Sequence, residues 1–176
     1  MSNSDALAAA ESRIRAIPDY PQPGVVFRDV APLIADGASL RASVSAMLEP
    51  FAGEFDVVAG VEARGFLLAG VAAAISGVGI LPVRKSGKLP RPAASEDYAL
   101  EYDTATIEVQ ADVEEGSSVL LLDDVLATGG TLDAATALVR RVGLEPVGIA
   151  VLLELPELGG RARLPNEVPV HSVFTA

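Results

Sequence analysis

The stretch of sequence that decides the fold runs from Val119 to Thr131 and reads Val-Leu-Leu-Leu-Asp-Asp-Val-Leu-Ala-Thr-Gly-Gly-Thr. Its first four residues carry no polar side chain, which predicts a parallel strand covered on both faces. Asp123 and Asp124 are expected at the end of this strand, where ligands bind in open α/β sheets. We therefore expect the two carboxylates to face a ligand.

A glycine loop follows the acidic pair and consists of Ala127, Thr128, Gly129, Gly130 and Thr131. Backbone N–H groups of such a loop can point at an anion, and the positive end of the next helix dipole adds to the attraction. Apolar residues at helical spacing predict that helix, at Leu132, Ala135, Leu138 and Val139. A sugar phosphate suits this arrangement, because carboxylates accept hydrogen bonds from ribose hydroxyls while loop amides hold the phosphate. The alternative is a purely structural turn after a strand.

The bulk composition limits the classes of function. The chain has 176 residues, half of them hydrophobic, without an apolar run long enough to span a membrane. It has no cysteine, which excludes disulfides, thiolate metal sites and a catalytic thiol. The first residues lack the pattern of a signal peptide, so a cytoplasmic location is expected. The net charge of -11 disfavours binding to nucleic acid or anionic membranes, so cations near the site must act locally.

Two further turns place cations after predicted strands. Arg64 follows a strand predicted for residues 56–61, and its alternative interpretation is an ordinary surface cation. Arg84 and Lys85 open a basic loop after a strand predicted from Gly79. Positive charge concentrated in an acidic chain favours a phosphate-binding role for this loop.

Residues 119–131 resemble the phosphoribosyl pyrophosphate signature of the type I phosphoribosyltransferase family, and the form found here is most similar to its adenine-specific members. Three other segments share the resemblance: residues 23–29, residues 62–66, and the Arg-Lys-x-Gly-Lys-Leu-Pro pattern that starts at Arg84. The similarity extends over about residues 10–165, and the joint occurrence of four motifs is far more specific than any one of them.

The resemblance implies a fold class that agrees with the alternation of strands and helices along the chain. This is the α/β type I phosphoribosyltransferase fold, a central, mostly parallel sheet flanked by helices. A small N-terminal hood would occupy about residues 18–32 and a flexible flap about residues 86–110, within one domain of residues 1–176. The implied reaction joins adenine to 5-phosphoribosyl-1-pyrophosphate and releases AMP and pyrophosphate. Magnesium would be carried mainly by the substrate with few or no direct protein ligands, and a homodimer would place Arg84 near the partner's site.

The resemblance also implies which residues bind the base and the pyrophosphate. Adenine would meet the N–H of Arg28 and the C=O of Val26, with the ring of Phe27 against the base and Leu155 as the second wall of its pocket. The residues implied to contact pyrophosphate are Ala63, Arg64, Arg84 and Lys85.

The remaining implied roles concern the sugar and the proton. The glycine loop would hold the 5′-phosphate, while Asp123 and Asp124 would hold the ribose. Glu101, at the end of the flap, is expected to accept or orient the N9 proton of adenine, because no histidine lies near it in the sequence. Asp103 replaces the glycine that follows Leu-Glu-Tyr in the family, which is a change in the flap.

Local patterns add expectations about single elements. Ser4 is expected to cap a helix that runs to about Ile17. Residues 90–102 predict a long polar loop, and residues 104–110 alternate like a strand. His171, the only histidine, is expected in a short C-terminal strand with a structural role.

Three other functions stay open from the residues alone. They are a phosphoribosyltransferase for another purine, a non-catalytic regulator that senses phosphoribosyl pyrophosphate, and a receiver-type signalling domain. The net charge argues against the regulator, because such proteins usually act on nucleic acid. The acidic pair lies too late in the chain for a receiver domain, in which it normally comes first.

Overall fold

The computed structural model describes residues 3–99 and 104–176, which divide into two compact units, Met1–Ala46 and Met47–Ala176. The first unit contains α1 (Asn3–Glu11), β1 (Arg15–Pro18), β2 (Val26–Asp29), α2 (Ala31–Ile34) and most of α3 (Gly37–Leu48). The second contains η1 (Glu49–Phe51), β3 (Val57–Val61), α4 (Arg64–Ser76), β4 (Gly79–Lys85), β5 (Ala94–Ala99), β6 (Thr104–Val109), β7 (Ser118–Leu126), α5 (Gly130–Arg141), β8 (Glu145–Glu154), η2 (Pro156–Leu158), η3 (Gly160–Arg163) and β9 (Val170–Thr175). Among the described residues, no helix is both long enough and apolar enough to cross a membrane.

The helix predicted to follow a cap at Ser4 and to run to about Ile17 is wrong at both ends, because Ser4 lies within α1. α1 stops at Glu11, and Arg15–Pro18 forms β1 instead. Two isoleucines at helical spacing, Ile14 and Ile17, are too few to exclude a strand. β1 pairs antiparallel with β2, which places Ile17 opposite Phe27, and this distant partner decides the local structure.

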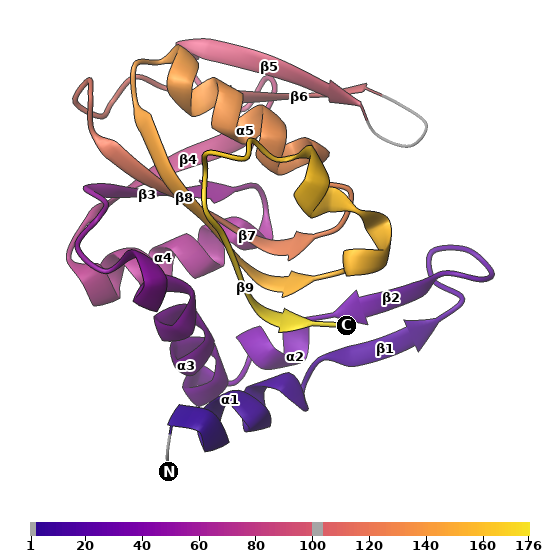
Figure 1. The fold of residues 1–176 in the computed structure, drawn as a ribbon. Coiled ribbons are helices and arrows are strands. Elements are labelled where there is room, and N and C mark those ends of the chain that lie inside the picture. The colour runs from indigo at the N-terminus through magenta and orange to yellow at the C-terminus, as the bar shows by residue number, and fades with distance from the viewer. Residues whose placement is uncertain (1–2, 100–103) are drawn as a thin grey trace. The chain divides into compact units, whose positions relative to one another are not determined.

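A sheet forms the centre of the second unit, with strand order β5-β6-β4-β3-β7-β8-β9 (Figure 1). The neighbours from β4 to β9 are all parallel, whereas β6 runs antiparallel to β4 and β5 runs antiparallel to β6. This arrangement confirms the predicted α/β class with a mostly parallel sheet. The apolar run from Val119 to Leu122 is fully buried at the centre of that sheet, as its sequence predicts.

Helices cover both faces of this sheet. Successive strand residues alternate between the faces. Leu121 packs in one apolar cluster with Leu132 and Leu138 of α5. On the other face, α4 lies so close to β3 that a Cβ added to Gly60 would be 2.8 Å from the Cβ of Ala69. β3 and the first half of β7 are therefore apolar because both of their faces are covered.

The parallel register brings three strand ends to one edge of the sheet. Gly60 of β3 lies opposite Leu122 of β7 on one side and opposite Pro82 of β4 on the other. Residues that follow these positions therefore reach the same edge, where open α/β sheets bind their ligands.

Two predicted boundaries differ from the structure. β7 continues to Leu126, so Asp123 and Asp124 lie within the strand, because parallel pairing with β8 extends past them to Glu154. The pattern predicts a loop over residues 90–102, yet the middle of this range contains β5, whose polar side chains give no strand period. β5 pairs antiparallel with β6, and β6 confirms the strand predicted there.

Candidate active site

The acidic pair lies near the carboxyl end of β7. Asp124 is buried, and its Oδ2 lies 2.9 Å from Nη1 of Arg64. Apart from this ion pair, Asp124 Oδ2 accepts no hydrogen bond from residues 3–99 and 104–176. Such a buried acceptor suits a hydroxyl of a ligand. Asp123 is half-buried, and its Oδ1 accepts the backbone N–H of Asp124 at 2.8 Å.

The surroundings of Asp123 favour its protonated form. Burial raises the pKa of Asp123 well above its ordinary value of 3.8, and the negative charge of Asp124 raises it further. The N–H of Asp124 and the positive charge of Arg64 lower the pKa, but their combined effect is smaller. A cation or a hydrogen-bond donor brought by a ligand would favour the charged carboxylate.

The predicted phosphate loop and Asp123 share one cavity. It has a volume of about 70 Å³, and its wall consists of Asp123, Val125, Leu126, Ala127, Thr128, Gly129, Gly130, Thr131 and Leu132. The structure thus brings all five predicted phosphate-binding residues together with one acid. Gly129 has a φ of 78° and directly precedes α5, whose first N–H groups and positive dipole end lie at the loop.

Gly65 allows the first turn of α4 to lie directly against β7. A Cβ at this position would be 2.8 Å from the carbonyl oxygen of Leu122 and 3.3 Å from Oδ1 of Asp123. Any side chain here would push Arg64 away from the acidic pair. Sequence reasoning did not assign this glycine a role, although its place directly after Arg64 in a strand-turn-helix segment is a signal of close packing.

Ala63 and Arg64 form the turn between β3 and α4. Ala63 is the residue before the helix, and the peptide bond that joins it to Glu62 is cis. The guanidinium of Arg64 is engaged with Asp124, so this predicted pyrophosphate residue is directed at the acidic pair.

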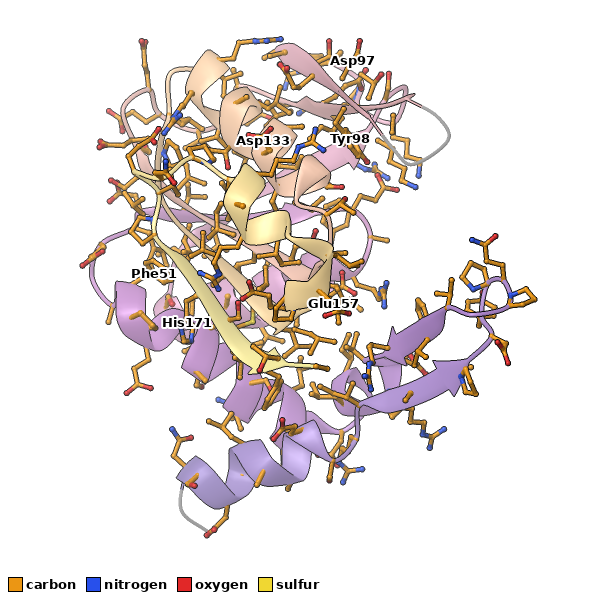
Figure 2. The ribbon with its side chains drawn as sticks, turned by 45° about the vertical axis from the view of Figure 1, so that its right-hand side comes forward. Phe51, Asp97, Tyr98, Asp133, Glu157 and His171 are labelled. Carbon is orange, nitrogen blue, oxygen red and sulfur yellow. The ribbon has the colours of Figure 1, made fainter. Side chains whose placement is uncertain are left out.

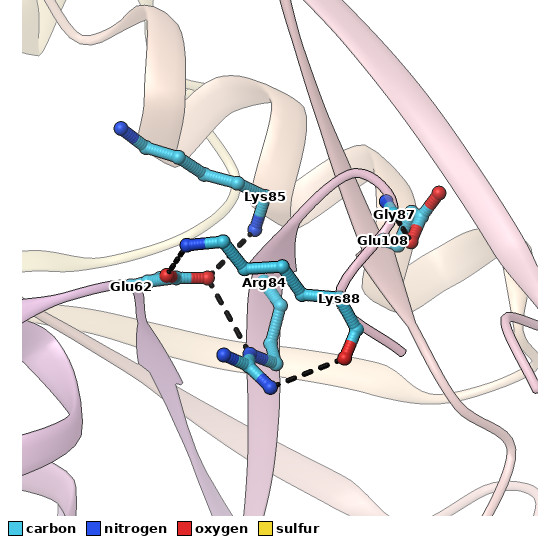
Figure 3. A network of polar contacts seen from close by, with 6 residues as sticks. All are labelled: Glu62, Arg84, Lys85, Gly87, Lys88 and Glu108. Atoms are coloured by element: carbon cyan, nitrogen blue, oxygen red, sulfur yellow. Dashed lines mark hydrogen bonds and ion pairs between the residues drawn. The ribbon is translucent and has the colours of Figure 1, made fainter. Parts of the chain in front are cut away.

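Glu62 organises the cations at the end of β4 (Figure 3). Its Oε2 accepts the backbone N–H of Lys85 at 3.0 Å and Nε of Arg84 at 3.4 Å, and its Oε1 pairs with Nζ of Lys88. The hydrogen bond from Lys88 is the main cause that lowers the pKa of Glu62. Glu62 therefore keeps its negative charge and fixes the direction of the basic residues.

Arg84 and Lys85 differ in what their side chains contact. The guanidinium of Arg84 donates Nη1 to the C=O of Lys88 at 3.2 Å and lies 6.0 Å from the centre of the Phe66 ring. The side chain of Lys85 points away from Glu62 (Figure 3), and among the described residues its ammonium has no partner. Lys85 is thus the predicted pyrophosphate cation that is free for a ligand.

Glu108 of β6 fixes the turn that follows Lys85. It is buried, and its two carboxylate oxygens accept Oγ of Ser86 at 2.7 Å and the N–H of Gly87 at 3.1 Å. Sequence reasoning missed both Glu62 and Glu108 as site residues. Their roles arise from the register of β3 and β6 against β4, which no local pattern contains.

The residues predicted to bind adenine belong to both units. Val26, Phe27 and Arg28 are consecutive in β2, and the ring of Phe27 meets the ring of Tyr20 edge to face at 5.3 Å. Leu155 directly follows β8 and is half-buried. Their role in binding adenine stays a prediction.

Three other predictions concern single residues and metal ligands. Glu101 and Asp103 lie outside the described residues. His171 lies in β9 in register with Ala150 and is half-buried (Figure 2). In the part of the chain that the structure describes, no group of three or more His, Cys, Asp or Glu side chains could hold a metal ion.

Similarity to known proteins identifies the family. Residues 33–173 match the phosphoribosyl transferase domain. An adenine phosphoribosyltransferase of Arthrobacter sp. (strain FB24) is 60% identical over 149 residues, which cover 84% of this chain and 80% of that protein. The chain belongs to the adenine phosphoribosyltransferase family.

Solved structures of adenine phosphoribosyltransferases share the fold over nearly the whole chain. The protein from Rhodothermus marinus DSM 4252 has a TM-score of 0.91 and 47% identity, with 98% of this chain and 99% of that chain covered. The protein from Saccharomyces cerevisiae, in complex with an imino-altritol bisphosphate and adenine, has a TM-score of 0.90 and 31% identity, with 97% and 99% covered. These similarities confirm the predicted type I phosphoribosyltransferase fold.

Proposed function

We propose that the chain transfers the 5-phosphoribosyl group of 5-phosphoribosyl-1-pyrophosphate to adenine, giving AMP and pyrophosphate. The observation that carries this proposal is the single cavity whose wall contains Asp123 and the whole loop of residues 127–131. Membership of the adenine phosphoribosyltransferase family supports adenine as the base.

In this proposal the phosphoribosyl group binds over the end of β7. The N–H groups of residues 127–131 and the dipole of α5 hold the 5′-phosphate. Asp123 and Asp124 accept hydrogen bonds from the ribose hydroxyls, and Asp124 Oδ2 has the unused acceptor capacity. The same carboxylates stabilise the positive charge that develops on the sugar as its bond to pyrophosphate breaks.

Pyrophosphate binds near the ends of β3 and β4, where Ala63, Arg64, Arg84 and Lys85 supply backbone and cationic groups. The ammonium of Lys85 has no other partner in the described chain, so its interaction with an anion breaks no existing contact. Arg84 is shared between Glu62 and the anion. These local cations offset the repulsion expected from an acidic chain with a net charge of -11.

Adenine recognition rests on backbone groups of β2. Val26 and Arg28 are two residues apart in an antiparallel pair, so their backbone groups point to the same side of the strand. The Val26 C=O and the Arg28 N–H match the N6 donor and the N1 acceptor of adenine, while Phe27 and Leu155 each offer an apolar side chain to the base.

The reaction proceeds by displacement at the anomeric carbon, where N9 of adenine replaces pyrophosphate. The enzyme holds the two reactants in line, which removes much of the entropic barrier. Glu101 accepts or orients the N9 proton. The flap of residues 86–110 closes over the site and excludes water, which would otherwise hydrolyse the activated sugar.

The site fits a magnesium ion carried mainly by the substrate. Asp124 Oδ2 is a buried carboxylate oxygen whose one contact among the described residues is the ion pair with Arg64, and magnesium prefers hard oxygen ligands and retains several waters. Asp123 and Asp124 would face the ion through ribose hydroxyls or water. When bound, the ion neutralises charge on the leaving pyrophosphate. Removal of magnesium by a chelator should abolish turnover, and addition of magnesium should restore it.

A homodimer would cover the exposed apolar side of α4. Leu67 and Ile75 are 52% and 40% exposed, and they lie on one helical face. Exposed apolar side chains gathered on one face mark interaction surfaces. The dimer would place Arg84 near the partner's site, and sedimentation of a fully active monomer would contradict it.

The remaining proposals are one domain over residues 1–176 and a cytoplasmic location. The first rests on the similarity to relatives over nearly the whole chain, and calorimetry should give one cooperative transition. The second rests on the absence of cysteine and on the phosphorylated substrates, and imaging of a tagged chain in its host tests it.

An assay with labelled phosphoribosyl pyrophosphate and a panel of bases tests the proposed reaction. We expect adenine to be converted to AMP, with at least about tenfold discrimination against hypoxanthine, because 6-oxopurines reverse the hydrogen-bond polarity at N1 and at position 6. Equal turnover of the two bases would contradict the adenine assignment. Failure to release pyrophosphate with any base would contradict the reaction itself.

A further inference from the structure

Arg161 of η3 forms a cluster of hydrogen bonds outside the site described above. Its Nε donates to Oε1 of Glu154 at 2.8 Å, and its Nη2 pairs with Oε2 of the same carboxylate. Nη2 also donates to Oγ of Ser172 at 2.9 Å, and Nη1 donates to the C=O of Val170 at 2.8 Å. One side chain thus ties η3 to the end of β8 and to β9.

The cluster is built for a charged pair. Glu154 is buried, and Oγ of Ser172 donates to its Oε2 at 2.5 Å. The hydrogen bond from Arg161 is the main cause that lowers the pKa of Glu154, with Ser172 adding to it. A two-pronged contact between guanidinium and carboxylate fixes orientation as well as distance, which a single surface ion pair does not.

The residue before Arg161 touches the phosphate loop through its backbone. A Cβ added to Gly160 would lie 2.1 Å from the carbonyl oxygen of Ala127 and 2.8 Å from N of Gly129. A Cβ added to Gly129 would lie 2.4 Å from the carbonyl oxygen of Gly160. The two segments are therefore in direct backbone contact, and a displacement of Gly160 must displace the loop.

We propose that Arg161 is a positioning residue for the 5′-phosphate cradle. Its hold on Glu154 and Ser172 keeps the backbone of Gly160 against residues 127–129, and this sets the direction of the loop amides. Arg161 does not touch the substrate in this inference, which rests on the proposed binding of the 5′-phosphate by the loop. Register supports the connection, since Glu154 lies opposite Leu126, the residue that precedes the loop.

Arg161→Lys tests the inference, because an ammonium retains the charge but cannot reproduce the two-pronged contact together with the bonds to Ser172 and Val170. Binding is measured by calorimetry with ribose 5-phosphate and, separately, with magnesium pyrophosphate. We expect the affinity for ribose 5-phosphate to fall about tenfold. The affinity for pyrophosphate should stay within about twofold, because its cations lie on other strands. In steady state, KM for phosphoribosyl pyrophosphate should rise more than kcat falls.

A matched control is Arg140→Lys. Arg140 also pairs with a glutamate, through Nη2 and Oε1 of Glu167 at 2.8 Å, but at the far end of α5 from the loop. This variant should bind both ligands like the wild type. If Arg161→Lys fails to fold, Ser172→Ala is measured instead, because it removes one hydrogen-bond partner of Arg161 and Glu154. This variant should weaken ribose 5-phosphate binding by about threefold or more and leave pyrophosphate binding unchanged.

The outcomes separate the inference from the proposed function. Unchanged ribose 5-phosphate affinity in folded Arg161→Lys, or an equal loss for both ligands, overturns the positioning role. If Ser172→Ala is used instead, an unchanged ribose 5-phosphate affinity or an equal loss for both ligands likewise overturns the positioning role. A wild-type protein that binds no ribose 5-phosphate and makes no AMP overturns the proposed function, and the positioning role with it. A selective loss of ribose 5-phosphate affinity supports both.

Discussion

The backbone N–H of Asp124 donates to Oδ1 of Asp123 at 2.8 Å, yet this hydrogen bond does not keep the pKa of Asp123 low. Burial and the charge of Asp124 raise that pKa well above its ordinary value of 3.8. Between the ordinary and the raised pKa, the folded chain binds more protons at Asp123 than the unfolded chain does. This group's contribution to stability is therefore full at acid pH and is lost as pH rises through the raised pKa.

Asp123→Asn should accordingly raise the melting temperature near neutral pH, because the asparagine carries no charge to bury. Each kcal/mol gained corresponds to roughly 2–4 °C in a domain of this size. The difference from the wild type should shrink as pH falls toward the ordinary pKa, and binding of phosphoribosyl pyrophosphate should weaken at all pH values. Thermal unfolding followed at a series of pH values checks this.

Comparing the wild type with Asp123→Asn separates the effect of Asp123 from that of carboxylates whose stabilisation depends on pH in the opposite direction. Glu62 and Glu154 have lowered pKa values, mainly because of Lys88 and Arg161, and their stabilisation is lost as pH falls. Both are present in the wild type and in Asp123→Asn, so they cancel in the difference. A variant that is less stable than the wild type at neutral pH would contradict the argument.

Gly129→Ala should weaken the binding of phosphoribosyl pyrophosphate at least about tenfold, with the fold retained. The added Cβ would take up space that the phosphate needs. It would also lie 2.4 Å from the carbonyl oxygen of Gly160, so it would push the loop away from the backbone that it packs against. A φ of 78° adds backbone strain, which costs about 1–2 kcal/mol in a residue with a Cβ. Calorimetric titration of the folded variant measures the loss.

Gly77→Ala is the matched control for the backbone strain alone. Gly77 has a φ of 72° at the end of α4, and a Cβ there would have no neighbour within 4 Å. Its variant should lose a similar amount of stability and keep its affinity for phosphoribosyl pyrophosphate. Equal affinities in the two variants would show that contact with Gly160 does not control the cradle.

The sequence predicted those parts of the fold and site that local patterns encode. The apolar run from Val119 to Leu122 is stable only in a strand whose two faces are both buried. The loop of residues 127–131 is predicted by its glycines and by the helix that comes next. Both appear in the structure as expected, and the loop lines one cavity with Asp123. Local pattern was sufficient here because neighbours in the sequence are also neighbours in the site.

Features that depend on distant partners could not be predicted in this way. Glu62 meets the cations of β4 through strand register, and Gly160 meets the loop from about thirty residues away in the sequence. β1 is a strand because β2 lies beside it, although Ile14 and Ile17 have helical spacing. In each case a tertiary contact decides between local alternatives that the sequence pattern leaves equal.

Lys85→Gln should reduce the affinity for pyrophosphate by roughly 10–100-fold, the range expected for a lost charged hydrogen bond. The melting temperature should hardly change, because in the described chain the ammonium of Lys85 has no partner to lose. The loss should diminish as salt concentration rises, since the contact is electrostatic. Calorimetry with magnesium pyrophosphate at two ionic strengths makes the measurement.

Arg91→Gln removes the same charge from an exposed position of the chain, where Arg91 pairs with Asp112 at 3.2 Å. It should leave pyrophosphate affinity within about twofold of the wild type. If both variants lose affinity equally, the effect reports the net charge of the protein, and a direct contact by Lys85 is excluded.

Glu101→Gln should leave substrate affinity nearly intact and lower turnover by roughly 10²–10⁴-fold, the contribution of a general base. Glu101 lies in the sequence between β5, which ends at Ala99, and β6, which begins at Thr104. We expect closure of the flap to bring this carboxylate to N9 of adenine, because the one histidine of the sequence, His171, lies in β9. Glu101→Leu should be no better, because it also lacks the carboxylate.

The deciding measurement is single-turnover formation of AMP with both substrates saturating, since it separates chemistry from binding and product release. Asp97→Asn serves as the control within the same flap range, because it also removes a negative charge, from a side chain that accepts a hydrogen bond from Oγ1 of Thr106 at 2.6 Å. We expect this control to react at close to the wild-type rate. Chemistry in Glu101→Gln within a few-fold of the wild type would show that Glu101 is not the proton acceptor, and the flap would then act only by excluding water.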